Sequence, residues 1–124
     1  MDELPLLVVD AANVVGSVPD GWWRDRAGAA ERLRDGLVEV AEHGIENSGP
    51  MEVVLVVEGK AAKVKSIDRV RVVPAPREGD DTIVDVVRDE CQGRRCIVVT
   101  ADRELRRRVS ELGAEVVGPR SVPR

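Results

Sequence analysis

Short apolar runs alternate along this chain with segments in which apolar residues recur every three or four positions. The runs are rich in valine, and they span 5–10, 53–57, 70–73, 96–99 and 115–117. Continuous apolar runs of this length are typical of parallel strands that are buried on both faces. The pattern therefore predicts five strands.

The segments between the runs have the periodicity of amphipathic helices. They predict helices over 24–43, 80–91 and 102–112, with a short helix near 61–66. Strands that alternate with helices are joined by right-handed crossovers, which give a mostly parallel sheet covered on both sides. We expect an α/β protein with three layers and a sheet of about five strands.

Length and charge limit the classes of protein that need to be considered. The chain has 124 residues; we expect a single domain over 1–118 and a loose tail over 119–124. Its 19 basic and 23 acidic side chains give a net charge of −4, so contact with nucleic acid would depend on local positive patches. No apolar run reaches membrane-spanning length and the N-terminus is acidic, so we expect a cytoplasmic protein without a membrane partner.

The chain has two cysteines, Cys91 and Cys96. Their spacing is not that of a CxxC motif, and a reducing compartment disfavours disulfide formation. We expect these side chains to be packing thiols.

Acidic residues follow the predicted strands. Asp10 ends the first strand, Glu58 follows the second, Asp80 and Asp81 begin the helix after the third, and Asp102 follows the fourth. The carboxyl ends of parallel strands share one sheet edge, where ligands of open α/β sheets bind. Like charges collected there would destabilise the fold unless a cation lies among them.

The side chains in this set favour a hard cation. All of them offer oxygen ligands, and the only histidine, His43, lies at the end of a predicted helix. We therefore expect Mg²⁺ or Mn²⁺ rather than zinc. Two such ions could activate a water molecule and stabilise the leaving oxygen of a phosphodiester.

Each of these residues also has a purely structural explanation. Aspartates at helix starts are usually caps, acids one turn apart usually form a solvated face, and acids or asparagines beside turns often only shape the loop. These explanations apply to Asp80 and Asp102, to Asp81 with Asp85, and to Glu58 and Asn13. The joint placement of acids after four successive strands favours a site.

The motifs "VVDAAN", "VVEGK", "GDDTIVDVV" and "VVTADREL" resemble those of the NYN branch of the PIN-like nucleases, over nearly the whole chain. The resemblance implies a PIN-like α/β/α fold and a metal-dependent ribonuclease site at the carboxyl ends of the strands. Asp10 and Asn13 match the first motif, Asp81 matches the acid of the "DxxI" helix start, and Asp102 matches the acid after "VT".

The same resemblance implies a role for each residue. Asp10, Asp81 and Asp102 would be the principal metal ligands, and Asn13 and Thr100 would orient carboxylates or a phosphate. The remaining acids would be outer ligands or a general base: Glu58, Asp80 and Asp85.

An acidic site that holds RNA needs cations around it. Lys60 lies two residues after Glu58 and Arg103 directly follows Asp102, so they are the favoured substrate contacts, whereas Arg106–Arg108 are more typical of a solvated helix face. Trp22 and Trp23 lie in a Gly/Pro-flanked loop, where they could stack on the unpaired bases of single-stranded RNA. They could equally close the end of the core or contact a partner chain.

Two other functions fit the same residues. A nucleoside triphosphate pyrophosphohydrolase would use the same acidic metal site on a smaller substrate. A PIN-like module that binds RNA or protein without cleavage, or a nuclease restrained by a protein partner, would retain the fold alone. A homodimer is compatible with each of these functions.

Overall fold

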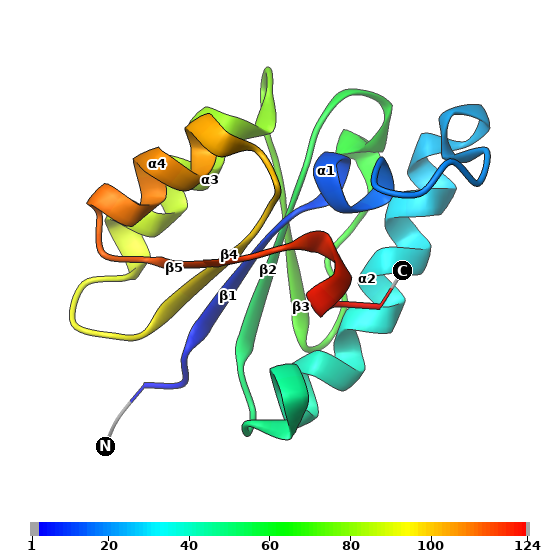
Figure 1. Ribbon diagram of the computed structural model, residues 1–124. Coiled ribbons are helices and arrows are strands. Elements are labelled where there is room, and N and C mark those ends of the chain that lie inside the picture. Colours follow the sequence, from blue (N-terminus) through cyan, green and yellow to red (C-terminus); the bar gives the residue numbers. More distant parts are fainter. Residues whose placement is uncertain (1–2, 124) are drawn as a thin grey trace.

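The fold is that of a computed structural model, which describes residues 3–123. Five parallel strands form one sheet in the order β3-β2-β1-β4-β5 (Figure 1). The strands are β1 (Leu6–Asp10), β2 (Glu52–Val57), β3 (Val70–Pro74), β4 (Cys96–Val99) and β5 (Glu115–Val117). Each predicted strand is present with its ends shifted by at most one residue. The predicted α/β fold with a parallel sheet is confirmed.

Helices cover both faces of the sheet and make it the middle of three layers (Figure 1). The α-helices are α1 (Ala11–Val15), α2 (Arg26–His43), α3 (Gly79–Glu90) and α4 (Arg103–Glu111). Short 3-10 turns complete the chain: η1 (Trp22–Arg24), η2 (Ile45–Asn47), η3 (Gly59–Lys63) and η4 (Pro119–Ser121). The three long predicted helices match α2, α3 and α4, while the short one is η3.

Alternate residues of each strand enter different halves of the core. Leu7 and Val9 of β1 pack in the half covered by α1 and α2. Leu6 and Val8 pack in the half covered by α3 and α4. Because both faces are covered, β1 is buried throughout, which explains its continuous apolar run.

The order of the strands creates a switch point in the sheet. From β1 the chain proceeds to β2 and β3 on one side, and then returns to place β4 and β5 on the other side of β1. The carboxyl ends of β1 and β4 therefore lie side by side while their connections diverge. Crevices at such points are where ligands bind in open α/β sheets.

The C-terminal segment differs from the predicted loose tail. It forms η4, and Val122 is only 5% exposed. Val122 joins the same half of the core as Leu33 and Leu37 of α2, beside which the C-terminal turn lies in Figure 1. Burial of this apolar side chain holds the segment against the body of the protein.

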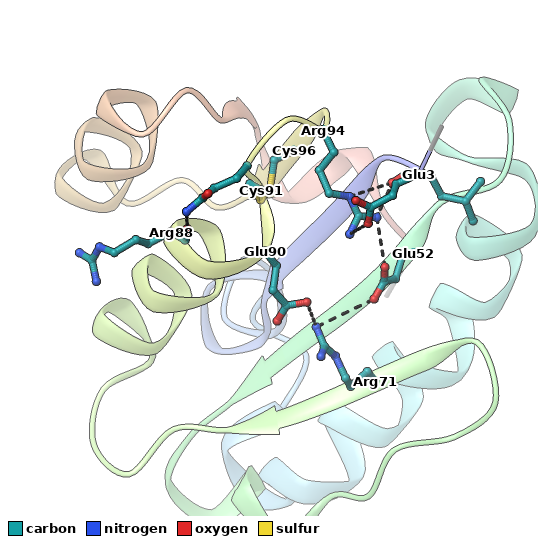
Figure 2. The surroundings of a disulfide bond; sticks show 10 residues. Glu3, Glu52, Arg71, Arg88, Glu90, Cys91, Arg94 and Cys96 are labelled. Carbon is teal, nitrogen blue, oxygen red and sulfur yellow. Dashed lines mark hydrogen bonds and ion pairs between the residues drawn. A yellow bond between two sulfur atoms is a disulfide. The ribbon is translucent and has the colours of Figure 1, made fainter. Parts of the chain in front are cut away.

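The expectation of two packing thiols is wrong, because Cys91 and Cys96 form a disulfide (Figure 2). Cys91 caps the end of α3, and the turn that follows brings the chain back to Cys96 at the start of β4. The two Cα atoms are 5.7 Å apart, within the range that a disulfide spans. The return turn, rather than a CxxC motif, produces this proximity.

Acids at the amino-terminal edge of the sheet are paired with arginines (Figure 2). Arg94 is 3.1 Å from Glu52 and 3.3 Å from Glu3. Arg71 pairs with Glu90. The acids at the opposite edge are arranged differently.

None of the helices described between residues 3 and 123 combines the length and the apolar character that a membrane crossing requires.

Candidate functional site at the carboxyl edge of the sheet

Asp10 ends β1 and is only 6% exposed. Its Oδ2 atom accepts a hydrogen bond of 2.9 Å from the hydroxyl of Thr100, which is fully buried after β4. Its Oδ1 atom accepts a longer bond, 3.4 Å, from the backbone N–H of Asn13 and so caps α1. The buried carboxylate is therefore held by groups from both strands of the switch point.

The loop between β4 and α4 is tied to the end of β1. The Oδ1 atom of Asn13 accepts a hydrogen bond of 2.9 Å from the backbone N–H of Ala101. Asp102 caps α4, because its Oδ1 atom accepts from the N–H of Leu105 at 2.9 Å, and its own N–H donates to the hydroxyl oxygen of Thr100 at 3.1 Å. Thr100 thus holds the Asp10 carboxylate through its hydroxyl, whereas the Asn13 side chain holds the loop after β4 and contacts no carboxylate.

Glu58 directly follows β2, and Asp80 lies in the first turn of α3. The Oε2 atom of Glu58 accepts from the backbone N–H of Gly79, the first residue of α3, at 2.5 Å. A carboxylate there also interacts favourably with the helix dipole. The bond fixes the start of α3 beside β2 and brings Asp80 to the same edge as Asp10.

Burial and mutual repulsion perturb two of these acids. Burial is the largest cause that raises the pKa of Asp10 to about 6; its hydrogen bonds with Thr100 and Asn13 oppose the change, and the charges of Asp80 and Glu58 add to it. Burial also raises the pKa of Asp80, followed by the charges of Asp102, Glu78 and Glu58. We use the name acid cluster for Asp10, Glu58, Asp80 and Asp102.

The acid cluster lacks the arginine partners found at the other edge. Within residues 3–123 no ion pair reaches any of its four carboxylates. The charge of Arg108 lowers the pKa of Asp80 only as a minor influence. The chain thus leaves four neighbouring negative charges without direct compensation.

The donor atoms of the acid cluster fit a hard divalent ion, since all are carboxylate oxygens. Their arrangement is looser than that of a closed site: across residues 3–123, no group of three or more Cys, His, Asp or Glu side chains is close enough to hold a metal ion. Several of the oxygens instead accept hydrogen bonds from the protein. The chemistry of the donors, rather than a completed coordination shell, is what suits the ion.

The placement predicted for Asp81 and Asp85 is not observed. The Asp81 side chain is 85% exposed and pairs with Arg108 at 2.9 Å, and Asp85 pairs with Arg88 at 3.0 Å on the surface of α3. The helix turns about 100° per residue, so Asp81 points away from the edge that Asp80 faces.

The sequence contained a signal that Asp80, rather than Asp81, is the acid of the motif. Ile83 is fully buried, and the spacing "DxxI" counted back from it reaches Asp80 rather than Asp81. Residues three apart lie on the same side of a helix. The motif as written therefore matches Asp80.

The cations divide into paired and unpaired groups. On α4, Arg106 donates to the carbonyl of Thr100 at 2.7 Å, and Arg107 pairs with Glu104 and Glu111, as expected for a helix surface. By contrast, Lys60 and Arg103 are exposed and make no ion pair with any described residue. Both are therefore available to a polyanion beside the acid cluster.

The two tryptophans have different surroundings. Trp22 is partly buried against the core, and the guanidinium of Arg26 lies 5.4 Å from its ring centroid. Trp23 is 49% exposed and meets Trp22 edge-on, with ring centroids 5.9 Å apart. Trp22 closes one end of the core and also lines a cavity, whereas its stacking on RNA bases stays a prediction.

No family model matches the sequence, and no curated protein matches it significantly. Solved structures do match. Rae1 (YacP) from Bacillus subtilis shares the fold with a TM-score of 0.67 at 19% identity, over 98% of this chain and 71% of that one. A point variant of the same protein gives a TM-score of 0.70 at 18% identity, over 98% and 72% of the two chains. At this identity the likeness establishes a shared fold.

Proposed function

We propose that this protein is a metal-dependent ribonuclease whose acid cluster holds Mg²⁺ or Mn²⁺. The observation that carries the proposal is the set of four carboxylates at the switch point without an ion pair, with the pKa of buried Asp10 raised to about 6. Unpaired acids at such an edge cost folding stability, which a bound cation would restore. The motifs that resemble those of NYN proteins favour RNA over other phosphodiesters.

The chain's own residues would divide the work. Asp10, Asp80 and Asp102 would supply oxygen ligands if a bound ion drew them closer together, and the ion would supply Lewis acidity at the scissile phosphate. Thr100 would keep the Asp10 carboxylate oriented through its hydrogen bond. Glu58 has one oxygen on Gly79 and no described partner for the other, so it is the candidate to accept a proton from the attacking water.

RNA would be held by cations beside the acid cluster. Lys60 follows Glu58 by two residues and Arg103 follows Asp102 directly, so each could bind a phosphate next to the one that is cleaved. Single-stranded RNA suits the Trp22 and Arg26 pair, because unpaired bases stack on such groups.

Cleavage of an end-labelled single-stranded RNA in Mn²⁺ tests the proposal. We expect wild-type protein to cleave it, Asp80→Asn to lose at least 100-fold in rate, and the neighbouring Asp81→Asn to stay within threefold. Equal loss in both variants would contradict the assignment of Asp80. Release of pyrophosphate from nucleoside triphosphates, with RNA left intact, would identify a pyrophosphohydrolase instead. Binding without any cleavage would identify an RNA-binding module.

A further inference from the structure

A cavity of about 580 Å³ opens beside the acid cluster. It is bounded by α1, the region from η1 into α2, the start of η3, and the turn before α3. Glu58 belongs to both features, since it lines the cavity and its charge raises the pKa of Asp10 and of Asp80. Whatever fills the cavity therefore lies next to the acids.

Much of the cavity lining is apolar. Its lining includes small side chains from three different elements: Ala11, Ala12, Val15, Ala30 and Ala61. Small side chains leave room for a planar group, and the volume is in the range of sites for small organic ligands. Such a lining suits the face of an aromatic ring.

One wall consists of groups on which nucleobases stack. Trp22 lines the cavity, and Arg26, also part of the lining, lies over its ring at 5.4 Å. Trp23 supports Trp22 from the side at an interplanar angle of 85°. Tryptophan rings and guanidinium planes are the usual stacking partners of unpaired bases.

The rim carries both kinds of polar group that a nucleotide requires. Arg77 is exposed, lines the cavity and makes no ion pair within residues 3–123, so it is available to a phosphate. Glu78 also lines the cavity and can accept hydrogen bonds from base N–H groups. An apolar peptide side chain or a lipid tail would use neither.

We propose that this cavity binds the base of the RNA nucleotide whose phosphate lies at the acid cluster. The inference rests on the proposed function, because that function supplies RNA as the ligand. It predicts that the protein reads one nucleotide beside the cleavage position by its base, in addition to its contacts with the backbone.

Abasic substitution combined with filling of the cavity tests the inference. A labelled pentanucleotide and five copies, each abasic at one position, are titrated in Ca²⁺, and gels verify that the RNA stays intact. We expect one abasic position to weaken binding to the wild type roughly tenfold. The Ala12→Phe variant fills the cavity from an exposed position. In this variant, the same abasic position in the RNA should weaken binding less than twofold.

Ser110→Phe is the matched control, because it adds the same ring to an exposed position on α4 and should keep the tenfold loss. Ala12→Leu replaces Ala12→Phe if the latter melts below the wild type. Abasic losses of equal size in wild type and Ala12→Phe, or no loss at any position, would overturn the base pocket. An intact base effect without RNA cleavage in Mn²⁺ would overturn the ribonuclease alone.

Discussion

Asp10 shows how one residue links stability to the proposed chemistry. A carboxylate that is 6% exposed and flanked by other acids is a poor choice for a core, yet Thr100 and Asn13 hold it in place by hydrogen bonds. The hydrogen bonds from Thr100 and Asn13 favour the ionised carboxylate. Burial and the charges of nearby acids oppose its ionisation, and burial has the largest effect of all. The native state therefore retains a proton on Asp10 at a pH where an unfolded chain has released it.

This property predicts an unusual pH dependence of stability. The pKa of folded Asp10, about 6, lies above the ordinary value of 3.8, so folding stabilises protonated Asp10, and this contribution is lost as the pH rises from about 4 through 6. Without divalent ions, Asp10→Asn should gain up to about 3 kcal/mol in unfolding free energy at pH 7.5 relative to wild type, and little at pH 4. Urea denaturation at both pH values measures this; an equal effect at both would contradict it.

At the scale of elements, the strands were predicted most accurately. Their valine-rich runs depend on burial from both faces, a local pattern that the final packing preserves. α1 was missed because five residues are too few to show a period, and its start depends on the cap that Asp10 provides.

The candidate site was predictable in its location more than in its side chains. The rule that strand ends meet at one edge brings Asp10, Glu58, Asp80 and Asp102 together. The rotation of α3 decides between Asp80 and Asp81, and it depends on which apolar residues enter the core. The disulfide depended on a return turn that sequence spacing did not reveal.

The disulfide should stabilise the turn that joins α3 to β4. Because it closes a loop of only a few residues, replacing both cysteines with alanine should lower the unfolding free energy by about 2 kcal/mol. Urea denaturation of the double variant and the oxidised wild type measures the difference. Two reactive thiols in the denatured protein prepared without reductant would show instead that the bond does not form.

At the scale of the whole molecule, charge is distributed unequally between the two sheet edges. Arginines neutralise acids at the amino-terminal edge, whereas the acid cluster has no such partners among the described residues. Around that cluster, the cations of η3 are unpaired and most of those on α4 are already engaged. A polyanion is therefore expected to cross η3.

The salt dependence of RNA binding tests whether RNA contacts the lysines of η3. Changing Lys60 and Lys63 to glutamine should weaken binding to single-stranded RNA and reduce the slope of log K against log salt by about 1.4, because each phosphate contact contributes about 0.7. Arg107→Gln is the control, since Glu104 and Glu111 already pair with this arginine, and it should leave the slope unchanged. Fluorescence anisotropy at four salt concentrations distinguishes the two results; a larger effect from Arg107→Gln would move the path to α4.

The proposed function requires the acid cluster to bind a divalent cation. Titration calorimetry with Mn²⁺ at pH 7.5 tests it on wild type, Asp80→Asn and Asp81→Asn. We predict that the wild type binds Mn²⁺, that Asp80→Asn binds at least tenfold more weakly, and that Asp81→Asn stays within threefold of wild type. No binding by the wild type, or equal weakening in both variants, would contradict the account.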